Sequence, residues 1–292
     1  MALFKQVVEA YIASKDLDQS AHSRLDFWVE ELGERELTTI TAEDIDAALV
    51  KLAERGSLRG GKRPTAAAGK PLAGATMNRY LTQAGSIFKH AKRLKLVPHA
   101  FVRPTLGIER APERANPERY LSPDEVVRLV AVARVLDRHW GKMTALIVVA
   151  YHTGLRVGSL LTARGKQLDL VAGTLTVPQT KNGDAITAGL SSAAIAELKR
   201  LPKAGRDELI FGNKAGKPFT YTPLWRRIAA EARLEGRVFH ELRHGHGYQL
   251  ARAGVSQQMI MKSMGHRTLT ASARYAHASI EDKKAVIAKV FG

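Results

Sequence analysis

The chain contains no cysteine among its 292 residues. This absence excludes disulfide bonds, catalysis by a thiolate and zinc sites built from cysteine. Long apolar runs are also missing, and a membrane-spanning helix needs about 18 or more such residues in succession. The apolar stretch at the amino terminus is interrupted by Glu9, so residues 1–16 predict a first helix and not a signal peptide. Together these absences fit a cytoplasmic protein.

Negative charge is scarce and unevenly placed. The chain has 45 Lys and Arg against 28 Asp and Glu, which gives a net charge of +17 and a pI near 10.2. Residues 55–108 contain no carboxylate, although about five would be expected at the average acidity of the chain. This pattern is typical of a surface that approaches phosphates, but a basic disordered loop would give it as well. We find no helix with the paired basic and apolar faces that would favour an anionic membrane surface.

Residues 1–103 predict a domain of four helices. The first helix carries apolar residues from Phe4 to Ile12 at helical spacing, and the second carries them from Leu25 to Leu32. The third opens with a capping-box-like start at Thr41 and stops at Gly56. A segment rich in glycine, proline and alanine then leads to a fourth helix over 76–97. On one face of this helix we predict a polar, partly basic stripe that lies along DNA: Arg79, Gln83, Ser86, His90 and Arg93.

Residues 104–117 predict a linker, because they contain Pro104, Pro112 and Pro117. A second domain over 118–292 then begins with a capping box from Ser122 to Glu125. An apolar helix ends near Gly154, and alternating segments over 168–190 predict strands with a hairpin turn at 182–183. The chain is predicted to be helical from residue 191 onward. The fold class is therefore mainly α with a small antiparallel β-sheet.

The stretch FHELRHGHG at residues 239–247 admits two interpretations. His240, Glu241 and His244 spell H-E-x-x-H, the zinc metalloprotease pattern. The longer form of that pattern requires a third histidine where this chain has Leu250, and His246 would point away from the helix face concerned. His240 and Arg243 also spell H-x-x-R, a pair suited to holding a phosphate. The missing third ligand disfavours the zinc interpretation.

Four further residues favour the phosphate interpretation. Arg156 lies in TGLR, Lys181 lies beside the predicted hairpin turn, His266 ends MGH, and Tyr275 lies in RYAH. Taken singly, each has an ordinary structural explanation, such as a surface ion pair, a solvated turn lysine or a half-buried tyrosine. Their joint occurrence, in this order around H-x-x-R, indicates chemistry on a phosphate.

With these motifs the chain resembles the tyrosine recombinases, and within them the phage-type integrases. The segments 76–97 and 119–130 are similar to that family as well, so the resemblance covers nearly the whole chain. It implies a four-helix core-binding domain followed by a tyrosine-recombinase catalytic domain. It also implies site-specific DNA recombination, for the integration or excision of a phage or other mobile element.

The resemblance assigns a role to each motif residue. Tyr275 attacks the scissile phosphate, which leaves a covalent 3′-phosphotyrosyl bond and a free 5′-hydroxyl. Arg156 and Arg243 bind the nonbridging oxygens, a task that suits forked guanidinium groups. The remaining roles fall to Lys181 as general acid, His240 as the acceptor of the tyrosine proton, and His266 as a hydrogen-bond partner of a phosphate oxygen. The scheme needs no metal or other cofactor, and it leaves Glu241 and His244 with structural roles.

Double-stranded DNA at attachment or core sites is the expected partner. We assign DNA contacts to residues of the first domain: Lys62, Arg63, Lys70, Arg79, Gln83, His90 and Arg93. We expect the two domains to close on the duplex from opposite faces, and four protomers to assemble as a tetramer on two sites. The segment after Tyr275 is a candidate for packing on a neighbouring protomer. Accessory DNA-bending proteins are further candidate partners, and the expected location is the nucleoid of a bacterial host cell.

The chain departs from the family pattern in two respects. Ser159 occupies a position that is commonly acidic, so the neighbours that orient Arg156 are expected to differ. Many phage integrases have an arm-binding domain ahead of the four helices. In this sequence Met1 directly precedes the first predicted helix, so no such domain is expected. Two alternatives stay open at this point, a catalytically silent DNA-binding protein of the same fold and a type IB topoisomerase with the same chemistry.

Overall fold

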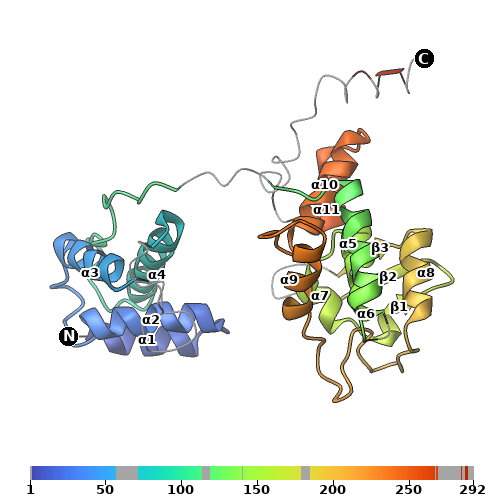
Figure 1. Ribbon diagram of the computed structural model, residues 1–292. Coiled ribbons are helices and arrows are strands. Elements are labelled where there is room, and N and C mark those ends of the chain that lie inside the picture. The colour runs from blue at the N-terminus through green and yellow to red at the C-terminus, as the bar shows by residue number, and fades with distance from the viewer. Residues whose placement is uncertain are drawn as a thin grey trace. The chain divides into compact units, whose positions relative to one another are not determined.

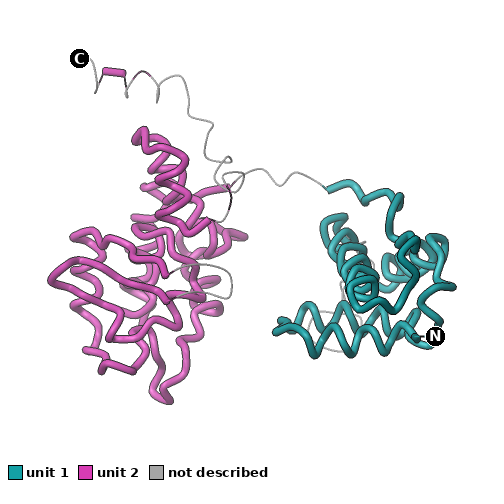
Figure 2. The backbone as a smooth tube through the Cα atoms, turned by 180° about the vertical axis from the view of Figure 1, so that it is seen from behind, with its two compact units in different colours: residues 1–116 teal, residues 117–292 magenta. Residues whose placement is uncertain are grey.

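The computed structural model describes residues 2–56, 72–113, 119–139, 141–178 and 185–266, together with residues 268, 284, 287 and 288. The chain divides into two compact units, Met1–Asn116 and Pro117–Gly292, which are coloured separately in Figure 2. Each unit has its own hydrophobic core. The mainly helical fold with a small antiparallel sheet is confirmed (Figure 1).

The first unit contains the four helices that the sequence predicts: α1 (Phe4–Ala13), α2 (Gln19–Leu32), α3 (Ala42–Arg55) and α4 (Gly74–Arg93). Two of their starts are fixed by side chains that accept hydrogen bonds from otherwise unpaired backbone N–H groups. Asp18 accepts from the N–H of Ala21, and Thr41 forms a reciprocal capping box with Asp44. The predicted stop of α3 at Gly56 is also confirmed, since this glycine has φ of +70°.

Helix α4 is more deeply buried than its sequence pattern predicts. It packs against α1, α2 and α3, so its buried face is wide. Gln83 and His90, which we expected on an exposed stripe, are only 8% and 5% exposed. The ring of His90 packs edge-on against Tyr11, and burial lowers its pKa. The exposed-stripe prediction is therefore wrong for these two residues, while Arg79 and Arg93 are exposed.

The first unit extends beyond residue 103, into the segment that the sequence predicts as a linker. The side chain of Asn78 on α4 donates to the carbonyl of Ala111 over 2.9 Å and to the carboxylate of Glu113 over 2.7 Å. The N–H of Ala111 donates in return to the amide oxygen of Asn78 over 2.9 Å. Residues up to 113 are thus fastened to α4.

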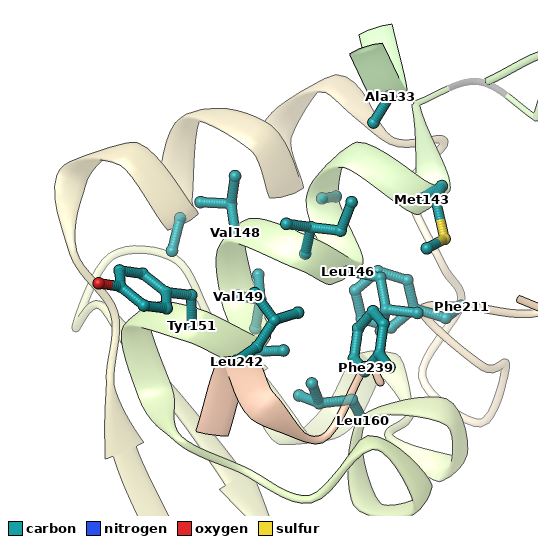
Figure 3. Close-up of a cluster of buried hydrophobic side chains, with 14 of the residues drawn as sticks. Ala133, Met143, Leu146, Val148, Val149, Tyr151, Leu160, Phe211, Phe239 and Leu242 are labelled. Carbon is teal, nitrogen blue, oxygen red and sulfur yellow. The ribbon is translucent and has the colours of Figure 1, made fainter. Parts of the chain in front are cut away.

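The second unit is built around α6 (Lys142–Thr153). Among the described residues of this unit, the other helices with assigned bounds are α5 (Pro123–Leu136), α7 (Val157–Thr162), α8 (Ser192–Arg200), α9 (Thr222–Glu231), α10 (Glu241–Arg252) and α11 (Gln257–Met264), with a short 3-10 helix η1 (Gly165–Gln167). Helices α5, α8 and α10 all pack against α6. Figure 3 shows Leu146, Val149 and Tyr151 of α6 in the same core as Leu242 of α10.

The sheet of the second unit has the antiparallel order β1–β2–β3. Its strands are β1 (Leu168–Asp169), β2 (Thr174–Val177) and β3 (Ile186–Gly189), and Val177 pairs with Ile186. Strand β1 is shorter than the alternating pattern predicts. The carboxylate of Asp169 accepts from the N–H groups of Val171 and Ala172, which turns the chain away from the strand. The predicted turn at 182–183 lies outside the described residues.

Apolar residues of the chain pack in these two cores. Among the described residues, no helix has both the length and the apolar character that crossing a membrane requires.

Candidate active site

Arg156 occupies the N-cap position of α7, directly after the turn that ends α6. Its side chain is exposed, and no hydrogen bond or ion pair joins it to any residue that the structure describes. Ser159 lies one turn further along α7, where its carbonyl accepts from the hydroxyl of Thr162 over 3.3 Å. The departure at Ser159 thus leaves Arg156 without a carboxylate brace at that position.

Arg243 is the central residue of the site, although it is only 4% exposed. From α10 its Nη1 donates to the carbonyl of Gly154, and its Nη2 donates to the carbonyl of Met264 over 2.6 Å. Gly154 and Met264 each lie two residues before another predicted site residue, Arg156 and His266 respectively. One guanidinium therefore joins the backbone segments that carry the other two residues to the helix of H-x-x-R.

Both of these segments are glycine turns with left-handed backbone conformations. Gly154 ends α6 with φ of +63°, and Gly265 ends α11 with φ of +61°. The space around them is also closed. A Cβ on Gly154 would lie 2.5 Å from the His246 ring, and a Cβ on Gly265 would lie 2.1 Å from Ile186 on β3. The positive φ favours glycine at both positions, and at Gly154 the contact with the His246 ring adds a packing requirement.

His240 and His266 lie at the ends of the helices that meet at Arg243. His240 is the exposed N-cap residue of α10, and its ring packs edge-on against that of His244 at 4.8 Å between centroids. His266 follows Gly265 directly and is partly buried, and its N–H donates to the carbonyl of Met261 over 2.9 Å. The structure therefore brings the turns that precede Arg156 and His266 to α10, near whose start His240 and Arg243 lie.

Glu241, the acidic residue of the H-E-x-x-H pattern, is engaged in an ion-pair network. It is 6% exposed, and its carboxylate accepts from Arg237 over 3.2 Å. Arg237 also donates over 2.9 Å to Glu125, the capping-box residue of α5. Glu241 thus ties the start of α10 to the start of α5, in agreement with the structural role expected for it.

His246 lies next to the same turn, and no motif in the sequence indicates a role for it. Its Nδ1 lies 3.0 Å from the carbonyl oxygen of Tyr151 on α6, and its ring lies against Gly154. Burial lowers the pKa of His246 to about 4, so the ring is neutral at physiological pH. Its partners are distant along the chain, and the spacing of the motif provides no signal for them.

Several predicted residues lie outside the described part of the chain. These are Lys181 and Tyr275 of the predicted catalytic set, and Lys62, Arg63 and Lys70 of the predicted DNA contacts. Of the remaining DNA contacts, Arg79 and Arg93 are exposed on α4. The guanidinium of Arg93 lies 3.0 Å from Nδ1 of the buried His90.

Comparison with known proteins decides between the interpretations of this site. The model of the phage integrase family matches residues 119–282, which is more than half of the chain. The chain belongs to the phage integrase family. It is a tyrosine recombinase, an enzyme that transfers DNA strands in site-specific recombination.

Relatives of this recombinase support the assignment along most of its length. It is 25% identical over 291 residues to the integrase of Salmonella phage P22, covering 90% of this chain and 72% of that protein. It is 27% identical over 214 residues to the tyrosine recombinase XerD of Pseudomonas putida, covering 69% of this chain and 70% of that protein. The H-E-x-x-H letters lie within the segment that the family model matches.

Solved structures share the fold. The integrase of transposon Tn1549, in complex with circular intermediate DNA, aligns with a TM-score of 0.72 at 18% identity, covering 98% of this chain and 99% of that chain. The lambda integrase tetramer bound to a Holliday junction aligns with a TM-score of 0.65 at 18% identity, covering 96% and 80%. The mainly helical fold of this recombinase is thus that of integrases.

Proposed function

We propose that this recombinase integrates or excises a phage or other mobile element at attachment sites in double-stranded DNA of a bacterial host. The observation that carries the proposal is the position of Arg243, whose guanidinium braces both the turn before Arg156 and the turn before His266. A phosphate placed at this junction would meet two cations that are permanently charged. Integrases among the relatives and the structural neighbours support DNA as the partner.

The proposed reaction needs no external energy source. The phenol oxygen of Tyr275 forms a bond to phosphorus, the bond from phosphorus to the 5′-oxygen breaks, and the bond energy is kept in the phosphotyrosyl link. His240 takes the phenol proton, and Lys181 supplies a proton to the departing 5′-oxygen. The 5′-hydroxyl of a partner strand then attacks the phosphotyrosyl bond and releases Tyr275.

The two arginines differ in how they would serve this reaction. Arg156 projects from an exposed position, as a direct phosphate ligand requires. Each terminal nitrogen of Arg243 carries two hydrogens, so donation to two backbone carbonyls is compatible with a phosphate contact. Losing one preorganised contact of this kind typically lowers the rate by about 10² to 10³.

The assembly belongs to the same proposal. We expect the two units to grip the duplex from opposite faces and four protomers to act on two sites. The lambda integrase tetramer on a Holliday junction supports this stoichiometry. The residues after Tyr275 are proposed to pack on a neighbouring protomer, accessory DNA-bending proteins are candidate partners, and the host nucleoid is the proposed location.

A nicked suicide duplex tests the reaction. A duplex selected for tight binding from a randomised pool is nicked near its centre and incubated with the protein in EDTA, and covalent adducts are separated on a denaturing gel. We expect an adduct that mass spectrometry maps to Tyr275, and we expect Tyr275→Phe to bind the duplex without forming it. Tight binding by the unaltered protein without any adduct would instead identify a catalytically silent DNA-binding protein.

A further inference from the structure

His246 satisfies a backbone group at the end of α6. Because a carbonyl oxygen only accepts, the 3.0 Å contact to Tyr151 requires that Nδ1 of His246 carries the proton. Tyr151 lies in the last turn of α6, where carbonyls have no partner within the helix. The other ring nitrogen, Nε2, is buried and has no hydrogen-bond partner among the described residues. The ring is therefore held in one tautomer and one orientation by the end of α6.

The same ring forms the surface on which the Gly154 turn rests. An ideal Cβ on Gly154 would lie 2.5 Å from Cδ2, 3.0 Å from Cγ and 3.2 Å from Nε2 of His246, so the backbone of Gly154 lies directly against the ring. Arg243, three residues earlier on α10, donates to the carbonyl of this glycine. Two side chains of α10 thus hold one turn. Arg243 donates to the carbonyl of Gly154, and the ring of His246 packs against the Cα of Gly154.

We propose that His246 is a positioning residue for Arg156, acting through the turn from Tyr151 to Gly154. The inference rests on the proposed function, in which Arg156 binds the scissile phosphate. Arg156 follows Gly154 by two residues, and it has no side-chain partner among the described residues that would hold it independently. The direction in which it leaves α6 is therefore set by the turn. The ring supports the turn by shape and by one hydrogen bond.

The charge state of the ring agrees with this role. Burial is the largest cause that lowers the pKa of His246 to about 4, and Arg243 and His152 act in the same direction. The pKa of His152, which lines the same cavity of about 340 Å³, is lowered by burial as well. Lys262 of α11 also lines that cavity, so a protonated His246 would face further positive charge. His246 therefore supports the turn as a neutral group throughout the neutral pH range.

The test compares cleavage rate with DNA affinity in the full chain. Adduct formation on the suicide duplex is followed in single turnover at saturating protein, and the Kd is measured separately. We expect His246→Ala to slow adduct formation about 10-fold to 100-fold, because a misplaced contact lowers the rate by such factors, while Kd changes less than about threefold. His246→Asn should recover most of the rate, since its amide N–H can donate to the carbonyl of Tyr151.

A control and a double variant separate positioning from general loss of stability. Leu198→Ala opens a cavity in the core of the same unit on α8, seven residues beyond the Ser191 that contacts His152, and should leave the rate below its melting temperature unchanged. Gly154→Ala should slow cleavage strongly, and less so when it is combined with His246→Ala, because the added methyl group then has space. Should His246→Ala fail to fold, His246→Phe keeps the ring without a donor, and it should cleave more slowly than His246→Asn.

The outcomes distinguish this inference from the function on which it rests. No adduct with the unaltered protein removes the proposed function, and the inference falls with it. An adduct at Tyr275 in the unaltered protein, formed at the same rate by His246→Ala, overturns the inference alone. A rate for His246→Asn no higher than that of His246→Ala would also overturn it, because the hydrogen bond to Tyr151 would then carry no positioning effect.

Discussion

At the scale of single residues, the two arginines expected at one phosphate occupy opposite environments. Arg156 is exposed and has no side-chain partner among the described residues, whereas Arg243 is 4% exposed and bonded to two backbone carbonyls. A residue that only binds the phosphate can be removed without harm to the fold. A residue that also joins two turns to α10 cannot.

This difference predicts the behaviour of two matched variants. Arg156→Gln and Arg243→Gln should both slow adduct formation by about 10² or more, since each arginine is a proposed ligand of the scissile phosphate. Only Arg243→Gln should lower the free energy of unfolding, by about 3 kcal/mol, because it disrupts charged hydrogen bonds inside the protein. Denaturant unfolding of the two variants provides the comparison. Equal stability of both would show that Arg243 does not brace the fold.

His246 predicts an acid sensitivity with a definite sign. Its folded pKa of about 4 lies below the value of about 6.5 for a free histidine, so protons bind preferentially to the unfolded chain. The stability that depends on the neutral ring is complete above about pH 6.5 and is lost as the pH falls toward 4. Between pH 7 and pH 4, the melting temperature of His246→Phe should fall less than that of the unaltered protein. If the melting temperatures of the two proteins fell equally over this pH range, the inference that the His246 ring is buried and neutral would be contradicted.

The sequence motifs indicate segments that lie together in the structure, but they do not indicate how each side chain is held. Arg156, His240, Arg243 and His266 follow from motifs, and their segments do converge at the start of α10. The bracing role of Arg243 depends on carbonyls 89 and 21 residues away in the chain, which no local pattern encodes. His246 was not predicted for the same reason, since its partners are a carbonyl and a glycine on another helix.

At the scale of elements, local chemistry predicts where helices start and packing decides how much of them is buried. The capping boxes at Thr41 and Ser122 are confirmed, because a cap involves only neighbouring residues. The polar stripe of α4 is wrong at Gln83 and His90, because α1, α2 and α3 surround that helix. A polar residue at helical spacing is no guide to exposure on a helix at the centre of its unit.

The turn between α11 and His266 provides a prediction at this scale. A methyl group on Gly265 would have to displace Ile186 of β3 in addition to adopting a positive φ, whereas Gly216 has φ of +70° with open space around it. Gly265→Ala should therefore destabilise the protein more than the roughly 1–2 kcal/mol that Gly216→Ala costs through backbone strain. It should also slow adduct formation, because His266 moves with the turn. Equal stability and equal rates in the two variants would show that the contact with β3 does not position His266.

At the scale of the whole molecule, the net charge of +17 predicts that the affinity for DNA depends strongly on electrostatic attraction to the phosphates. Each phosphate contact releases counterions, so the logarithm of the affinity should fall steeply and linearly with the logarithm of the salt concentration. The carboxylate-free stretch over 55–108 includes α4, where Arg79 is exposed and Gln83 is buried four residues later. These two side chains allow the electrostatic contribution of α4 to be measured against an internal control.

Arg79→Gln should weaken DNA binding to all duplexes alike and reduce the salt slope by about 1, as the loss of one phosphate contact requires. Gln83→Ala should lower the melting temperature of the protein, because its side chain is buried, and it should leave that slope unchanged, because glutamine carries no charge. Binding titrations of both variants from about 50 to 200 mM salt, the range over which phosphate contacts weaken most visibly, give the two slopes. A salt slope that Arg79→Gln leaves unchanged would mean that Arg79 makes no phosphate contact, because the loss of a cation at a phosphate must reduce the number of counterions released.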